Sequence, residues 1–245
     1  MRDASDATVN KIPAVGNPPT METVEFARGR GADVYGDPSH CTVLMWHGAQ
    51  PDARSTMGPL AERVAERGAG VIVSDWNSHA DDRGRSDLLG SLRFVGARWA
   101  TPIVLVGWSL GGAAAAGATI HAKKFDLELS HTVCLAGAFM VADSVSGQTL
   151  PTDLAEFGEG APFTLVHGID DDVIPVDVSR NFAATLRDSR WPVELVELPT
   201  DHAAIAGAAY DPASDRYLPA TDPQAFATVD AVADRIANIV AAMGG

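Results

Sequence analysis

Residues 106–112 read Val-Gly-Trp-Ser-Leu-Gly-Gly and constrain the fold more than any other stretch of the chain. An apolar, β-branched run comes directly before them, and an alanine-rich run comes directly after. Because β-branched residues favour strands and alanine favours helices, the context predicts a strand, a tight turn and a helix. The turn has the pattern Gly-x-Ser-x-Gly, in which Gly107 and Gly111 let strand and helix pass closely. It raises Ser109 above the end of a sheet, beside the free N–H groups of a helix start.

Strand-like and helix-like segments alternate along most of the chain. Strands are expected in short apolar runs, and helices where apolar residues recur at helical spacing. The expected strands cover residues 24–26, 33–35, 42–46, 71–73, 103–106, 132–139, 163–166 and 191–198, the first two as a hairpin around Gly29 and Gly31. Helices are expected with caps at Ser55 or Thr56 and at Ser86, then after Ser109, around 178–186 and from Pro223. This alternation predicts the α/β class, with a single doubly wound, mostly parallel sheet flanked by helices.

The 245 residues suffice for one such domain with a sizeable core. Residues 1–20 contain several prolines and aspartates and are expected to form an irregular N-terminal arm. Residues 21–245 are expected to form the single domain. The strand at 191–198 carries two glutamates, so we expect it near an edge of the sheet.

The net charge of −14 disfavours nucleic acid and anionic membrane as partners, since both require basic patches. The N-terminus lacks the apolar core of a signal peptide, and no apolar run is long enough to span a membrane, which favours a cytoplasmic location. Cys41 and Cys134 lie in predicted strands and are interpreted as buried thiols without metal-ligand spacing. We therefore expect neither a metal nor an organic cofactor.

Several chemically active side chains follow predicted strands. Sites in doubly wound sheets form at the carboxyl ends of the strands. A serine nucleophile needs an adjacent base, and in this strand–turn–helix setting the chain order is serine, acid, histidine. His202 is the only histidine beyond the acidic cluster at 170–172, so we assign it the role of base.

The acid is expected within Asp170, Asp171 and Asp172, and the residues alone leave all three open. An acid in this position fixes the histidine tautomer and stabilises the imidazolium. A calcium loop is the weaker alternative, because the cluster lacks the spaced pattern of calcium ligands. The oxyanion hole is expected from the backbone N–H groups of Leu110 and of Ala49, with Gln50 as the second choice for the latter.

Together these motifs resemble the α/β-hydrolase family. The resemblance rests on the Ser109 turn, the His47-Gly48 strand end, the His167-Gly168-x-x-Asp171-x-x-Ile174-Pro175 segment and Asp201-His202, in that order. In the family pattern the acid is the fourth residue after the histidine, which implies Asp171. The segment between the strands ending at Phe139 and starting at Phe163 is too short for a large cap domain, so the chain is most similar to small cap-less carboxylesterases and dienelactone-hydrolase-like serine hydrolases.

Two departures from these relatives concern the subfamily. Dienelactone hydrolases have a cysteine nucleophile where this chain has Ser109. The strand end reads His47-Gly48-Ala49-Gln50 rather than the His-Gly-Gly-Gly of one esterase branch. The absence of an aspartate at position 109 argues against the chemistry of dehalogenases and epoxide hydrolases.

The resemblance implies a serine hydrolase that cleaves small-molecule carboxylic esters through an acyl-enzyme. An amidase, peptidase or thioesterase would share the same residues, and a non-enzymatic binding protein of this fold is the weakest alternative. Candidate substrate-binding residues are Gln50, Trp108 (with Trp46 and Trp76 as neighbours at strand ends) and Tyr210. Tyr210 lies in a long loop expected at 203–220, and residues 77–87 are a second candidate rim. Without a cap, the site is expected to suit small to medium esters.

Overall fold

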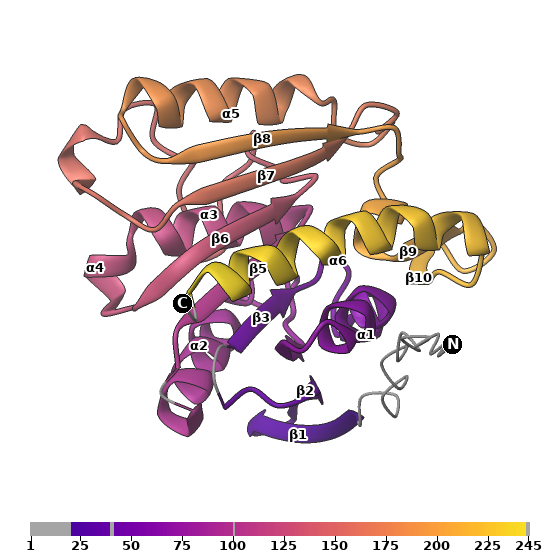
Figure 1. Cartoon of the computed structure of the whole chain (residues 1–245). Helices are drawn as coiled ribbons and strands as arrows, with labels where there is room; N and C mark the ends of the chain where they lie inside the picture. Colours follow the sequence, from indigo (N-terminus) through magenta and orange to yellow (C-terminus); the bar gives the residue numbers. More distant parts are fainter. Residues whose placement is uncertain (1–20, 40–41, 100, 244–245) are drawn as a thin grey trace, which may run out of the picture.

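An eight-stranded sheet forms the centre of the molecule (Figure 1). The computed structural model describes residues 21–39, 42–99 and 101–243. The strands are β1 (Met21–Ala27), β2 (Arg30–Tyr35), β3 (Thr42–Trp46), β4 (Gly70–Ser74), β5 (Ile103–Trp108), β6 (Leu129–Leu135), β7 (Phe163–Gly168) and β8 (Val193–Leu198). They lie in the order β1-β2-β4-β3-β5-β6-β7-β8. β2 pairs antiparallel with both neighbours, and all strands from β4 to β8 in this order pair parallel. The mostly parallel sheet, the first hairpin and the edge position of β8 are thus confirmed.

Helices cover both faces of the sheet (Figure 1). They are α1 (Gly58–Glu66), α2 (Arg85–Trp99), α3 (Leu110–Ile120), α4 (Ala122–Phe125), α5 (Asp177–Asp188) and α6 (Pro223–Met243). α1 and α6 pack on one face, while α2, α3 and α5 pack on the other. Successive strand side chains point to opposite faces, so Met45 joins the first core and Leu44 and Trp46 join the second.

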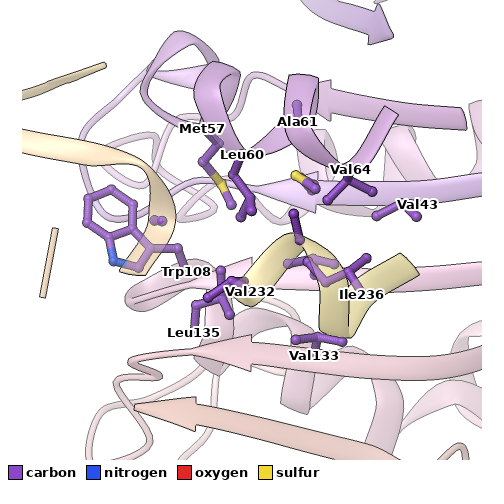
Figure 2. Close-up of a cluster of buried hydrophobic side chains, with 14 of the residues drawn as sticks. Val43, Met57, Leu60, Ala61, Val64, Trp108, Val133, Leu135, Val232 and Ile236 are labelled. Atoms are coloured by element: carbon purple, nitrogen blue, oxygen red, sulfur yellow. The ribbon is translucent and has the colours of Figure 1, made fainter. Parts of the chain in front are cut away.

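Figure 2 shows the core between the sheet and the pair α1 and α6. Val43 and Val133 of the sheet face Leu60 of α1 and Ile236 of α6, and all four side chains are fully buried. Burying a side chain of this size contributes about 1.5–3 kcal/mol. This core fixes the positions of β3 and β5, whose carboxyl ends carry His47 and Ser109.

The helix caps expected at Ser55 or Thr56 and at Ser86 are wrong. A short 3₁₀ helix (Arg54–Met57) precedes α1, and no side chain caps α1. The Thr56 hydroxyl donates instead to the Ala53 carbonyl at 2.6 Å. Ser86 lies inside α2, where its N–H donates to the Asp82 carboxylate at 2.9 Å. A carboxylate placed by the preceding turn thus takes the capping role that the serine was expected to fill.

The strand expected at 132–139 also ends earlier. β6 stops at Leu135, because Ala136 has a φ of 45° and turns the backbone away from the sheet. The N–H of Ala138 then donates to the carbonyl of Ser109 at 3.0 Å, so this turn crosses the serine turn. Between this point and β7 the only helix is a short 3₁₀ helix (Ala155–Phe157), and no helical cap is inserted there.

The segment expected as a long loop at 203–220 has regular structure. A 3₁₀ helix (Ala204–Ala206) leads into β9 (Ala208–Asp211) and β10 (Arg216–Pro219), which form a separate antiparallel hairpin. Cys134 is a free, buried thiol, whereas Cys41 and the arm at 1–20 lie outside the described residues. Of the helices in the described ranges, none is long and apolar enough to cross a bilayer.

Candidate active site

Ser109 sits on a strained turn between β5 and α3. Its φ of 56° and ψ of −120° are unusual for a residue with a side chain. A Cβ on Gly107 would lie 2.1 Å from the Gly111 carbonyl oxygen, and one on Gly111 would lie 2.3 Å from the His47 carbonyl oxygen. Only glycine fits at these two positions, so the close passage of strand and helix expected from the sequence is present.

The structure brings Asp171 and His202 together. His202 Nδ1 lies 2.8 Å from Asp171 Oδ2, and the Asp171 side chain is fully buried while His202 is 3% exposed. Asp170 and Asp172 are exposed neighbours in the same loop. The question that the residues left open is thus answered in favour of Asp171 as the partner of His202.

Asp171 is strongly stabilised as an anion. Burial alone would raise the pKa of this carboxyl, but hydrogen bonds from His167, from His202 and from the N–H of Ile174 hold the pKa well below its usual range. The other oxygen, Oδ1, accepts the N–H groups of Val173 and Ile174 at 2.9 and 2.8 Å. The carboxylate is therefore a permanently charged acceptor that orients His202.

Trp108 connects the histidine to the serine turn. Its indole Nε1 donates to the His202 carbonyl at 2.8 Å, and the two rings lie 5.4 Å apart. His202 is thus held over the residue that precedes Ser109. Among the described residues the Ser109 hydroxyl makes no hydrogen bond. Such bonds are often long before substrate binds, so the contact between serine and base belongs to the proposed mechanism.

The loop after β3 is organised by a neutral histidine. His47 Nε2 lies 3.2 and 3.3 Å from the N–H groups of Ala53 and Trp76, so this nitrogen accepts. The proton is therefore on Nδ1, which donates to the Gly48 carbonyl at 2.9 Å. Burial lowers the pKa of His47 to about 4, which keeps the ring neutral near pH 7.

This hydrogen bond also orients the Ala49 N–H. The C=O and N–H of one peptide unit point in opposite directions, so the N–H that follows the Gly48 carbonyl points away from His47. A Cβ on Gly48 would lie 3.4 Å from the Ser109 Cβ, which places this peptide beside the serine. Leu110 is the first residue of α3, where a backbone N–H has no partner within the helix. The Leu110 N–H directly follows Ser109, and the Gly48 residue that precedes the Ala49 N–H lies beside it.

The candidate substrate-binding residues have different surroundings. Trp108 is 2% exposed, and Trp46 and Trp76 are fully buried, so these indoles are packed core. Gln50 uses both ends of its amide on the backbone of Tyr217, donating to the carbonyl at 3.0 Å and accepting the N–H at 2.8 Å. Gln50 therefore fastens the β9–β10 hairpin to the loop after β3, and its role toward substrate stays a prediction.

The β9–β10 hairpin forms a wall next to His202. Tyr217 packs its ring 5.1 Å from Trp108 and 6.1 Å from His202, a placement that sequence reasoning missed. Tyr210 is 51% exposed and donates to Asp215 at 2.6 Å. Both tyrosines line, with His202, a cavity of about 980 Å³ whose lining does not include Ser109. No local signal distinguishes Tyr217 from Tyr210, because the contact with His202 depends on how the hairpin folds back.

In the described part of the chain, no side chains are arranged as a set of metal ligands. Across the described ranges, no three side chains of histidine, cysteine, aspartate or glutamate come together in a way that would hold an ion. Asp170 and Asp172 diverge from the buried Asp171 toward solvent. What the structure places together is a strained Ser109 turn and the buried pair of Asp171 and His202.

Comparison with known proteins gives likeness in structure alone. No protein-family model matches the chain, and no curated protein matches it. A butyrate-bound esterase from Thermogutta terrifontis superposes with a TM-score of 0.64 at 16% identity, over 88% of this chain and 92% of that one. Est1E from Butyrivibrio proteoclasticus gives 0.62 at 16% identity, over 90% and 99%. The Thermogutta terrifontis esterase 2 phosphorylated by paraoxon gives 0.65 at 16% identity, over 92% and 96%. With its sheet order, serine turn and helices on both faces, the chain therefore has the α/β-hydrolase fold.

Proposed function

We propose that this chain is a serine hydrolase that cleaves carboxylic esters with small to medium acyl or alcohol groups through an acyl-enzyme. The observation that carries the proposal is the buried Asp171–His202 pair, held by Trp108 directly against the strained turn of Ser109. A strained serine alone occurs in other settings. A serine with a buried, charge-stabilised acid–base pair beside it has the parts required for nucleophilic catalysis.

Each residue has one role in the proposed reaction. His202 takes the proton of Ser109 as the hydroxyl attacks the ester carbonyl, and Asp171 stabilises the resulting imidazolium. The N–H groups of Leu110 and Ala49 hold the negative charge that develops on the carbonyl oxygen, each being worth about 2.7–4 kcal/mol of barrier. His202 then gives its proton to the leaving alcohol. Water activated by His202 releases the acid and restores Ser109.

The proposed substrate size follows from the surroundings of the serine. No helical cap lies between β6 and β7, and Ser109 is partly exposed, so esters reach it from solvent. The similar structures were solved with butyrate, propionate or ferulic acid bound, and one was phosphorylated by paraoxon. Small carboxylic acids on proteins of this fold are consistent with small to medium esters as substrates here.

Hydrolysis of p-nitrophenyl esters from acetate to octanoate tests the proposal. Wild type and Ser109→Ala are compared, with Ser214→Ala, an exposed hairpin serine bonded to Asp211, as the matched control. We expect activity that falls with chain length, is lost in Ser109→Ala and is unchanged in Ser214→Ala. Labelling by a fluorophosphonate should follow the same pattern. A wild type inert on every ester, or labelling that persists in Ser109→Ala, contradicts the proposal.

A further inference from the structure

A second buried histidine contacts the same carboxylate oxygen as His202. His167 Nε2 lies 3.2 Å from Asp171 Oδ2, the atom that His202 Nδ1 approaches to 2.8 Å. His167 is fully buried near the end of β7, four residues before Asp171. With two backbone N–H groups on Oδ1 and two imidazoles on Oδ2, all four acceptor positions of the carboxylate are used.

The contacts of His167 fix its tautomer. Nε2 also lies 2.9 Å from the Ile174 carbonyl, and since both its neighbours are acceptors, Nε2 carries the proton. Nδ1 lies 2.7 Å from the hydroxyl of Ser179, which makes no other side-chain hydrogen bond among the described residues. Ser179 therefore donates to Nδ1. The result is a buried chain of hydrogen bonds, Ser179 to His167 to Asp171, that ends at His202.

We propose that His167, fixed by Ser179, is a positioning residue for the acid, which aims Asp171 Oδ2 at His202 and withdraws part of its negative charge. The inference rests on the proposed function, because it assigns a role within the same site. Nothing places His167 in contact with a substrate or with Ser109. It acts through the carboxylate, and a hydrogen bond to a charged acceptor is strong enough to set the direction of that carboxylate.

Removing His167 should therefore have two separable effects. The acid loses a fixed direction, which lowers kcat. The remaining negative charge of Asp171 then acts on His202 alone and favours the imidazolium. The acid limb of the kcat/KM profile thus moves to higher pH. A residue that only filled space would donate nothing to Asp171 Oδ2, so its removal would leave the charge on that oxygen, and with it the acid limb, unchanged.

Other charged groups face this chain of hydrogen bonds from the elements packed around it. Glu197 of β8 stands opposite His167 in the sheet register and is paired with Arg180 of α5 at 2.7 Å. Arg180 also pairs with Asp177 of the same helix at 2.9 Å, and Asp172 and Asp201 lie near Tyr217 of β10 on the other side. None of them changes in the variants below, so a shift in the profile reports on His167.

Kinetics of His167→Leu and His167→Gln test the inference. Leucine removes both nitrogens, whereas the glutamine amide can still place an N–H near Asp171. We expect His167→Leu to lower kcat about ten- to a hundredfold with KM unchanged, and to move the acid limb to higher pH. His167→Gln should recover most of the rate. His131→Leu is the matched control, because His131 of β6 pairs with the Thr164 hydroxyl at 2.9 Å near the start of β7, away from His167 near its end.

Ser179→Ala serves where His167→Leu fails to fold, with Thr185→Ala on the same helix as its control. It should lower kcat in the same direction by a smaller factor. Proton NMR of the N–H that His202 shares with Asp171 gives a readout independent of turnover, and this resonance should shift in each His167 and Ser179 variant. An unchanged rate and resonance, an acid limb that stays in place or moves to lower pH, or a glutamine variant no better than leucine overturns the inference. A wild type without hydrolase activity refutes the proposed function instead, and the resonance still tests His167.

Discussion

Asparagine at position 171 keeps the size of the aspartate but exchanges one acceptor oxygen for an NH₂ donor. In the structure all four partners of the carboxylate are donors: the N–H groups of Val173 and Ile174 on one oxygen, and the imidazoles of His167 and His202 on the other. Whichever way the amide faces, its NH₂ group meets two donors. Asp171→Asn therefore changes the hydrogen bonding of the site without changing its volume.

The size of the effect follows from the tautomer of His202. When the NH₂ group faces the imidazoles, His202 Nδ1 must accept, and its proton moves to Nε2, the atom that takes the proton of Ser109 in the proposed reaction. The equivalent change in a serine protease costs about 10⁴ in kcat, which corresponds to roughly 5.4 kcal/mol of barrier. We expect a loss of this order here. When the amide faces the other way, two buried N–H groups lose their acceptor, at a cost of about 1–3 kcal/mol of stability each.

The assay is hydrolysis of p-nitrophenyl butyrate, with thermal unfolding to establish that each variant is folded. Asp170→Asn and Asp172→Asn are matched controls, since they remove the same charge from exposed positions of the same loop. Surface substitutions of this kind usually change stability by less than about 0.5 kcal/mol, and both should retain activity. If Asp171→Asn kept more than about a tenth of kcat, or if a control lost as much, the assignment of the acid would be refuted.

Three further predictions concern the scaffold of the site. Gly107→Ala puts a Cβ 2.1 Å from a carbonyl oxygen of α3 and should cost about 3 kcal/mol or more in urea unfolding, whereas Gly96→Ala, where a Cβ meets nothing within 4 Å, should be neutral or stabilising. Burial lowers the pKa of His47 to about 4, so as the pH falls the unfolded chain binds this proton before the folded chain does. The free energy of unfolding should therefore fall by about 3 kcal/mol from its value above pH 6.5 to its value at pH 4. Urea unfolding that gives the same free energy at both pH values would contradict this. Gln50→Ala removes both bonds to the backbone of Tyr217 and should make the β9–β10 hairpin sensitive to limited proteolysis, which an unchanged digest would exclude.

The serine turn could be predicted because its determinants are consecutive. Gly107, Ser109 and Gly111 stand between a β-branched run and an alanine-rich run, so local preferences and the close approach of strand and helix agree. The acid could not be chosen in the same way. Three adjacent aspartates have the same chemistry, and which one turns inward depends on the backbone of the loop after β7, where two N–H groups converge on Asp171. Only the family resemblance pointed to Asp171, the aspartate that contacts His202.

Segment ends were less predictable, because tertiary contacts decide them. Ser86 is a good capping residue by type, but the turn before it brings the Asp82 carboxylate to the N–H groups of Gly84 and Ser86 at the start of the helix. The apolar residues after Leu135 continue a strand pattern, yet Ala136 turns the backbone, and the N–H of Ala138 donates to the Ser109 carbonyl instead of to a neighbouring strand. In both cases the local sequence predicts one hydrogen-bond partner, and a residue that this local pattern does not include takes its place.

The hairpin beside His202 depends on a contact between residues 167 positions apart in the chain. A primary amide offers one donor and one acceptor side by side, so Gln50 pairs with Tyr217 as a residue of an adjacent strand would. The same short loop carries Ala49, the proposed oxyanion donor, while Tyr217 packs on His202. The β9–β10 hairpin and the Ala49 N–H are therefore linked through the same loop after β3. A displaced hairpin should therefore also displace the loop that carries the Ala49 N–H. We expect substitutions in the hairpin that change KM to change kcat as well.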